Sequence, residues 1–332
     1  MTQTTPSTPA IDTHAHIYPS WYLDRLEAIG ISSDSTDIAR ISGASSSPED
    51  LSRRWADMDA ANVDIQVIAA TPQVPAAPNA DDSAEAAREI NNYYAQLVAE
   101  HPTRLRAYGV LPLPHIQEAV AEAGRVLDEL GFLGVSLNAT LPDPDFVLSD
   151  PALDPLWQAL DERSAVVNIH PTGNGLHSPL ITKHGLGWVN GAPIEDATAV
   201  LHLLKADVPQ RYPHLHFHIA HLGGDLPFLA QRLEDNYSDW GAFPSSPLES
   251  LRKMSFDAAN FHIPSLVLAD TTFGTARILG GSDDPYFQHD KYVRAFSYIR
   301  EAPLSKEKTD AILRNNALDL YGEKALTEDP HQ

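Results

Sequence analysis

Eight short apolar runs, separated mainly by stretches of helical periodicity, constrain the fold of this chain more than any other feature. The predicted strands cover residues 10–14, 64–70, 104–111, 132–137, 165–170, 214–221, 254–259 and 276–281. Between them, apolar residues recur at helical spacing, as in Ile194, Ala197, Val200/Leu201 and Leu204. Eight such alternations favour an α/β fold in which parallel strands close into a (β/α)8 TIM barrel.

An open, doubly wound parallel sheet is the competing architecture. Such sheets usually carry a glycine-rich, phosphate-binding turn after the first strand. Here that position reads IDTHAHI (11–17), which contains no glycine. The sequence therefore favours the closed barrel and gives no indication of a nucleotide cofactor.

The chain is long enough for one large barrel domain, because 43% of its 332 residues are hydrophobic. We expect the barrel to occupy residues 10–322, with a disordered tail at 1–9 and a C-terminal tail at 323–332. Two insertions, at about 17–46 and 171–192, follow the first and fifth strands. Long loops at the carboxyl ends of barrel strands are where lids and substrate contacts are usually found.

Composition excludes several classes of function. The chain contains no cysteine, so disulfides, thiolate nucleophiles and cysteine-ligated metal centres are ruled out. A net charge of −22 argues against nucleic acid as a partner, because a phosphate backbone would be repelled. No apolar stretch reaches the length of a membrane span, and the first residues lack the features of an export signal. We therefore expect no membrane partner and a cytoplasmic location.

Two histidines end the first predicted strand. His14 and His16 stand at positions i and i+2, so both side chains point to the same face, toward the barrel mouth. Two imidazoles held close together form half of a site for a divalent metal. An isolated H-x-H is a weak signal, but a barrel places its catalytic groups at the carboxyl ends of its strands.

Three other strand ends carry groups of the same kind. His170 ends the fifth strand, His221 ends the sixth and Asp283 follows the eighth. With His14 and His16, they predict a cluster of potential metal ligands on one rim of the barrel.

Strand alternation separates these residues from their neighbours. Along the sixth strand, His214, His216 and His218 alternate with His221, so we expect them to face the helices or solvent without a catalytic role. By the same argument Asp284 should face away from the site that Asp283 enters.

The segments IDTHAHIYP, NIHPTG, IAHLGGDLPF and GGSDDPYF resemble those of the amidohydrolase-related, metal-dependent decarboxylases. This family includes the decarboxylases of aminocarboxymuconate semialdehyde, γ-resorcylate, 5-carboxyvanillate and 6-methylsalicylate. The resemblance runs from about residue 10 to 322, ending in NNALDLYG, and implies a distorted barrel holding one divalent metal. By resemblance, His14, His16, His170 and Asp283 are the metal ligands.

The resemblance also implies that His221 binds the metal or shuttles a proton beside it. Zinc is the expected ion, with manganese as the alternative, because three imidazoles and a carboxylate suit either. Relatives of this kind are usually homodimers or larger assemblies, so we expect a homo-oligomer.

Two further residues are implied to contact the substrate. The aminocarboxymuconate enzymes carry R-x-R-x-M-D, and the segment RWADMD (54–59) keeps only the first arginine, Arg54. The loss of the second arginine favours a simple aromatic acid over a dicarboxylate. Trp188, in GWVNGAP, matches a tryptophan that lines the substrate pocket.

These features predict a non-oxidative decarboxylase of a hydroxylated aromatic or related unsaturated carboxylic acid. The metal would hold the carboxylate and a neighbouring phenol oxygen, and His221 or Asp283 would relay the proton. Three alternatives remain open at this point. They are a metal-dependent hydrolase of an ester, lactone or amide, a hydratase of an unsaturated acid, and a catalytically inactive binding protein.

Overall fold

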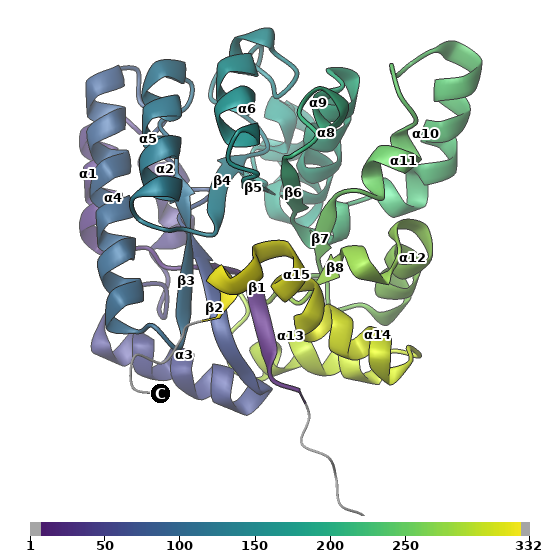
Figure 1. Cartoon of the computed structure of the whole chain (residues 1–332). Helices are drawn as coiled ribbons and strands as arrows, with labels where there is room; N and C mark the ends of the chain where they lie inside the picture. Colours follow the sequence, from purple (N-terminus) through teal and green to yellow (C-terminus); the bar gives the residue numbers. More distant parts are fainter. Residues whose placement is uncertain (1–7, 327–332) are drawn as a thin grey trace, which may run out of the picture.

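The computed structural model describes residues 8–326 and consists of a ring of helices around eight strands (Figure 1). The strands follow one another around the sheet in chain order, and every neighbouring pair is parallel. They are β1 Ala10–His16, β2 Val63–Ala69, β3 Leu105–Val110, β4 Gly134–Asn138, β5 Val166–His170, β6 His216–Ile219, β7 Ser255–Asp257 and β8 Ile278–Leu279. All eight predicted strands are present, although β6, β7 and β8 are shorter than predicted.

The segment after β8 returns to β1 and nearly closes the barrel. The backbone N–H of Thr13 donates to the Gly280 carbonyl at 2.9 Å, and that of Asp283 donates to the His14 carbonyl at 2.8 Å. An isolated parallel bridge joins Ala15 to Asp284. These contacts confirm the (β/α)8 barrel over the open sheet.

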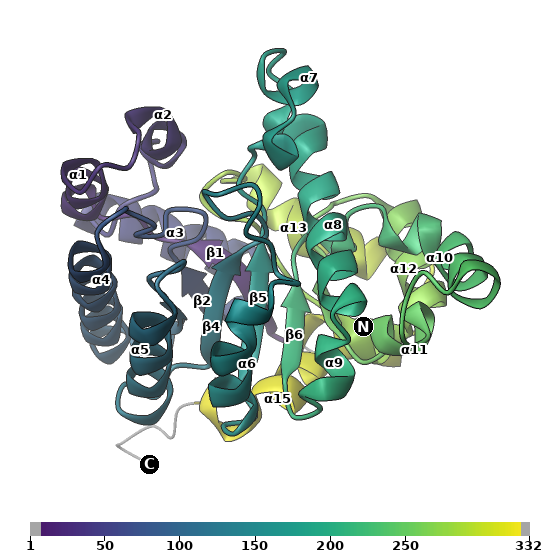
Figure 2. The ribbon, with the colours of Figure 1, turned by 90° about the horizontal axis from the view of Figure 1, so that it is seen from above.

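Helices cover the outside of the barrel (Figures 1 and 2). The longer ones are α1 Ser20–Ala28, α3 Pro48–Ala61, α4 Ala80–Glu100, α5 Ile116–Asp128, α6 Asp154–Asp161, α8 Ala192–Lys205, α10 Leu226–Trp240, α12 Ile263–Phe273 and α13 Asp290–Glu301. The shorter ones are α2 Ser33–Thr36, α7 Pro179–Thr182, α9 Val208–Arg211, α11 Pro247–Leu251, α14 Lys306–Asp310 and α15 Asn316–Tyr321. None of the helices within residues 8–326 combines the length and the apolarity needed to cross a bilayer.

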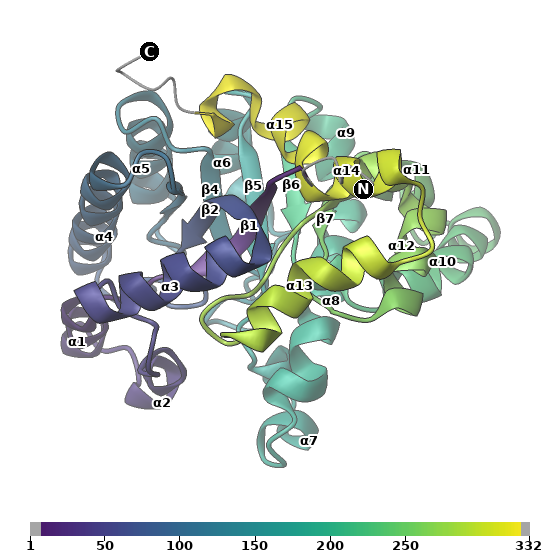
Figure 3. The same ribbon diagram turned by 90° about the horizontal axis from the view of Figure 1, so that it is seen from below.

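Two apolar clusters hold these layers together. The larger lies between the strands and the helices, and the smaller fills the barrel with side chains such as Ile11, Val67 and Tyr108. Tyr321 and Ala325 belong to the smaller cluster, so the chain packs into the barrel beyond the predicted boundary at 322. Figure 3 shows α15 at the end of the barrel seen from below. Residues 1–7 and 327–332 of the predicted tails lie outside the described residues.

The two long connections flank the opposite end of the barrel. The first, after β1, contains α1 and α2, and the second, after β5, contains α7 and a π-helical turn at Gly187–Gly191. In Figure 2, α7 projects away from the ring of helices. Both connections contribute side chains to the same cavity, so they shape the entrance of the site described next.

Candidate active site

Four predicted ligands meet at the carboxyl end of the barrel. His14 and His16 come from β1, His170 ends β5, and Asp283 follows β8. Each offers one ligand atom, and these atoms lie within 4.8 Å of one another. The three histidines are buried, so the cluster lies below the surface, where a divalent ion could reach all four groups at once.

The hydrogen bonds of the three imidazoles orient their lone pairs. Each Nδ1 has an oxygen partner: Asp257 Oδ2 at 2.9 Å for His14, the Ala69 carbonyl at 3.3 Å for His16, and the Pro171 carbonyl at 2.7 Å for His170. These acceptors place the proton on Nδ1 and leave Nε2 as the ligand atom. Nε2 of His14 and of His170 is buried and has no hydrogen-bond partner among the described residues. A bound divalent cation would satisfy both atoms, so the residues fit a metal.

The charge state of the cluster agrees with this fit. Burial lowers the pKa of His16, and burial together with the neighbouring histidines holds the pKa of His170 well below its usual value. Burial raises the pKa of Asp283, but hydrogen bonds with His16 and His221 outweigh burial and lower that pKa overall. Burial acts to lower the pKa of His14, but the Asp257 carboxylate raises it overall. Neutral imidazoles at His16 and His170 beside an ionised Asp283 are the form that binds a metal ion.

His221 lies beside the cluster, paired with an acid that sequence reasoning missed. Its Nδ1 is 2.9 Å from Oδ2 of Asp196, and its Nε2 is 3.6 Å from Oδ2 of Asp283. Asp196 belongs to α8 and is fully buried. A Cβ on Gly224 would lie 2.0 Å from the Pro193 carbonyl oxygen, so this glycine lets the loop after β6 approach α8 closely.

Burial and charge act in opposite directions on the pKa values of the two groups of this pair. Burial raises the pKa of Asp196 to about 7, although His221 acts to lower it. Burial acts to lower the pKa of His221, but the Asp196 and Asp283 carboxylates raise it well above its usual value. The pair therefore holds a proton-bearing imidazole next to the ligand cluster.

The prediction that His218 faces the helices or solvent is wrong. Its side chain is fully buried, with Nε2 3.1 Å from Asp257 Oδ2 and Nδ1 2.9 Å from the Tyr108 hydroxyl. The alternation fails because β6 ends at Ile219, and His221 lies beyond it with φ 53°, in the left-handed region. His214 and His216 are exposed, as expected.

Asp257, at the end of β7, is a second buried acid that the sequence analysis missed. Its Oδ2 accepts from His14 and His218, and its Oδ1 accepts from the backbone N–H of His221 at 3.1 Å. Beyond His218, the Tyr108 hydroxyl lies 2.5 Å from that of Tyr321 in α15. A continuous chain of buried hydrogen bonds thus runs from the ligand His14 to the last α-helix.

The sequence predicts a substrate contact for Arg54, and the structure places this residue in a buried ion pair. This residue of α3 is fully buried, its Nη1 is 2.5 Å from Asp284 Oδ2, and its Nη2 donates to the His16 carbonyl at 2.6 Å. Arg54 lines none of the cavities described below. Its hydrogen bond to the His16 carbonyl stabilises the end of β1 instead. Asp284 faces Arg53 and Arg54, away from the ligands, as predicted.

A cavity of about 580 Å³ opens beside the ligand cluster. His170, His221 and Asp283 form part of its wall. Most of the other lining residues are apolar or aromatic: Ile38, Trp188, Ala192, Pro193, Ala259, Phe261, Tyr286 and Phe287. Trp188, which the sequence analysis expects to line the substrate pocket, is among these residues. Within the described part of the chain, Arg294 of α13 is the only lysine or arginine in this lining, and its guanidinium lies 5.7 Å from the Phe261 ring centroid.

Two characterised relatives are similar over most of the chain. The 2-amino-3-carboxymuconate-6-semialdehyde decarboxylase of Dictyostelium discoideum is 27% identical over 278 residues, which cover 81% of this chain and 76% of the relative. The decarboxylase macB of Penicillium terrestre is 32% identical over 254 residues, which cover 72% of this chain and 75% of the relative.

Solved structures share the fold. The dihydroxybenzoic acid decarboxylase of Polaromonas sp. JS666, solved with bound manganese and the inhibitor 2-nitroresorcinol, superposes with a TM-score of 0.80 at 20% identity. The match covers 95% of this chain and 97% of that one. A sequence profile of the amidohydrolase family matches residues 11–322. The chain described here therefore belongs to the amidohydrolase family.

Proposed function

We propose that this protein is a metal-dependent, non-oxidative decarboxylase of a hydroxylated aromatic or related unsaturated carboxylic acid. The observation that carries the proposal is the His221–Asp196 pair, which lies beside a four-residue metal cluster and faces an aromatic-lined cavity. The decarboxylases among its relatives support the same reaction class.

Non-oxidative decarboxylation replaces a carboxylate with hydrogen, so the site must deliver a proton to the carbon that loses CO2. A divalent ion held by His14, His16, His170 and Asp283 would supply a positive charge to orient the carboxylate and stabilise the developing anion. His221 is the proposed proton donor, through Nε2, because its Nδ1 is engaged by Asp196. Asp196 positions the ring and stabilises its charged form.

The cavity walls support an aromatic substrate. Trp188 and Tyr286 lie nearly parallel, with ring centroids 6.3 Å apart, and with Phe261 they give the substrate ring a flat apolar surface. Such walls also exclude water from the developing carbanion. We assign Arg294, in place of Arg54, the role of binding an acidic or hydrogen-bond-accepting substituent of the substrate.

Three finer assignments accompany this proposal. Zinc is the proposed native metal and manganese the alternative, because the ligand set suits both. A homodimer or larger assembly stays an expectation from the resemblance to the family. The cytoplasmic location stays an expectation from the sequence.

The reaction can be tested by measuring CO2 release from a panel of ortho-hydroxy aromatic acids in D2O. We expect CO2 and a product that carries one deuterium at the carbon that bore the carboxylate. Ester, lactone and amide substrates are assayed in parallel. If these are hydrolysed while no acid in the panel releases CO2, the chain is a hydrolase and the proposal is wrong.

A further inference from the structure

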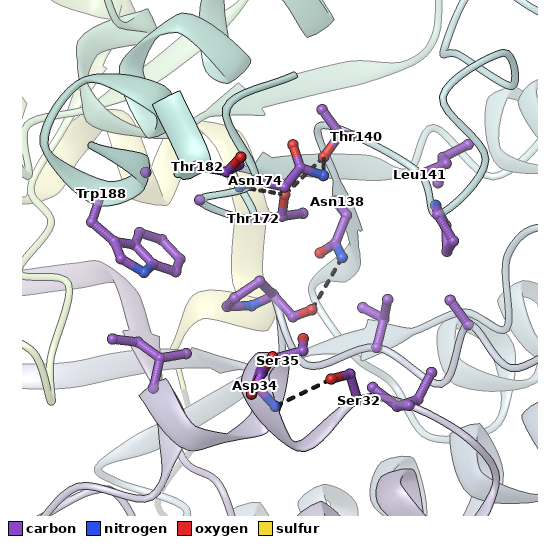
Figure 4. A pocket seen from close by; sticks show the side chains of 18 of the residues that line it. Ser32, Asp34, Ser35, Asn138, Thr140, Leu141, Thr172, Asn174, Thr182 and Trp188 are labelled. Carbon is purple, nitrogen blue, oxygen red and sulfur yellow. Dashed lines mark hydrogen bonds between the residues drawn. The ribbon is translucent and has the colours of Figure 1, made fainter. Parts of the chain in front are cut away.

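A second cavity, of about 790 Å³, adjoins the one that contains the ligand cluster. Ile38 and Trp188 line both cavities, so the two spaces meet at these side chains. Figure 4 shows the second cavity, with Trp188 on one side. The proposed decarboxylation leaves this cavity without a role.

The walls of this second cavity are polar but carry almost no charge. Asn138 and Thr140, which end and follow β4, and Thr172 and Asn174, which follow β5, form one side, and Ser32 and Ser35 contribute from the connection after β1 (Figure 4). Among residues 8–326, this lining contains no lysine, arginine or histidine, and Asp34 is its only acid. Without a cation it is poorly suited to an anion, whereas hydroxyl and amide groups suit a neutral polar ligand.

Asn138 presents an unused hydrogen-bond acceptor at the rim. Its Nδ2 donates to the Pro72 carbonyl at 3.0 Å, which fixes the orientation of the amide. Its Oδ1 has no partner among the described residues, although the side chain is about nine-tenths buried. Figure 4 shows this oxygen turned toward the interior of the cavity. Asn138 pairs with His170 across β4 and β5, so the acceptor lies next to the metal centre in the sheet.

Asn174, whose side chain is partly buried, offers a second free acceptor. Its Nδ2 donates to the Thr140 hydroxyl at 2.8 Å, and its Oδ1 has no partner among the described residues. The surrounding loop is held by the fully buried Glu195, which accepts from the backbone N–H of Thr172 at 2.6 Å and from that of Gly175 at 2.7 Å. The Oδ1 atoms of Asn138 and Asn174 are therefore two oriented acceptors without a donor, and they would bind a ligand that supplies O–H or N–H groups.

We propose that the second cavity binds a neutral, hydroxyl-bearing side chain of the substrate, which extends past Trp188 from the ring whose carboxylate lies at the ligand cluster. This inference rests on the proposed decarboxylation and narrows its substrate class. The substrate is then an aromatic acid with a hydroxylated substituent rather than a bare hydroxybenzoate.

A matched pair of compounds tests the proposal. One is a 2-hydroxybenzoate with an alkyl substituent that ends in a hydroxyl group, and the other has the same chain ending in a methyl group. Kd is measured by calorimetry on metal-loaded His221→Asn protein, which lacks the proposed proton donor and so consumes the compounds at least about 100-fold more slowly. We expect the hydroxylated compound to bind at least about tenfold more tightly, because its O–H pairs with a buried acceptor.

The same ratio of Kd values is then measured after adding Asn138→Leu or Asn174→Ala. Each variant should bring the ratio of the two Kd values to within about threefold of unity. A general loss of affinity weakens the binding of both compounds alike and therefore leaves this ratio unchanged. Thr198→Val is the control, because Thr198 is not among the residues that line the second cavity and should leave the ratio unchanged. Equal Kd values for the two compounds, or a ratio that survives both asparagine variants, would overturn the inference.

Failure of the proposed reaction gives a different result. If the wild-type protein, which keeps His221, releases no CO2 from either compound, the decarboxylase proposal fails. The ratio of Kd values still decides whether the second cavity recognises a hydroxyl group.

Discussion

At the scale of single residues, the geometry of the metal cluster depends on which ring nitrogen of each histidine is left to bind a metal ion. The oxygen partners of Nδ1 on His14, His16 and His170 direct every Nε2 to the same point, and Asp283 supplies the carboxylate. The function of the site therefore depends on groups that bind no metal themselves, above all Asp257 and Asp196.

The first prediction concerns metal content. Protein purified without chelator should contain about one equivalent of a divalent metal, and His16→Ala should lose most of it because one of four ligands is missing. Elemental analysis by mass spectrometry measures both, with the exposed His214→Ala as the control. Metal content near zero that added zinc or manganese does not restore, or unchanged content in His16→Ala, would contradict the assignment.

The second prediction separates proton transfer from metal binding at His221. His221→Asn should keep its metal and lose about 10²- to 10⁴-fold in kcat, because Asn cannot transfer the proton. Asp196→Asn keeps the shape but not the charge of the positioning carboxylate, so we expect a loss of about 10- to 100-fold in kcat with little change in KM. Steady-state kinetics and metal analysis test both variants. A His221→Asn protein that cannot retain metal would make His221 a ligand in its own right.

At the scale of helices and strands, a buried ion pair joins α3 to the segment after β8, which itself bridges to β1. Arg54 and Asp284 have no exposed side-chain surface, and Arg54 also holds the His16 carbonyl. This contact fixes the strand end that carries His14 and His16. Arg54 can therefore contribute to the site by holding this strand end, without contacting the substrate.

The third prediction follows from this pair. Arg54→Met should lower the free energy of unfolding by about 3 kcal/mol, because it leaves a buried carboxylate with one fewer cation, although Arg53 still contacts Asp284 at 2.6 Å. Arg104→Met is the control, since Arg104 pairs with the exposed Asp59 and should cost less than about 1 kcal/mol. Chemical denaturation measures both. If Arg54→Met leaves the free energy of unfolding unchanged but raises KM for the acid substrate strongly, Arg54 binds substrate and the structural role is wrong.

The sequence predicts these elements better than it predicts their ends. The existence of all eight strands follows from apolar runs, and strand-end histidines locate the ligands because parallel strands share one carboxyl edge. His221 and Asp283 lie in turns with φ of 53° and 58°, where the two-residue alternation no longer applies, so the alternation placed His218 on the wrong face. Asp196 was missed because it stands within the helical stripe of α8, and no local pattern links it to His221.

At the scale of the whole molecule, one hydrogen-bonded chain spans the barrel. It leads from His14 through Asp257, His218 and Tyr108 to Tyr321, so the metal cluster is connected to the helix that covers the other end. Buried polar chains of this kind are stabilising only while every member keeps its partners.

The fourth prediction tests this chain at its middle. His218→Leu removes the partner of Asp257 and of Tyr108, so the free energy of unfolding should fall by about 1–3 kcal/mol. Metal affinity should fall about 10- to 100-fold, because Asp257 then holds His14 less firmly. Thermal unfolding and competition with a chelator measure the two effects, with the exposed His216→Leu as the control. Equal behaviour of the two variants would show that the chain contributes nothing.

The order of the ligands along the chain has a consequence for how the protein is made. His14 and His16 leave the ribosome early, whereas Asp283 lies near the other end of the sequence, and its backbone N–H bonds the His14 carbonyl. The complete ligand set cannot exist until most of the chain has been synthesised and β1 has been joined by the segment after β8. Binding of a metal ion by all four groups would therefore be a late event in the maturation of this protein, and a nascent chain stalled before residue 283 would have only the three histidines with which to hold an ion.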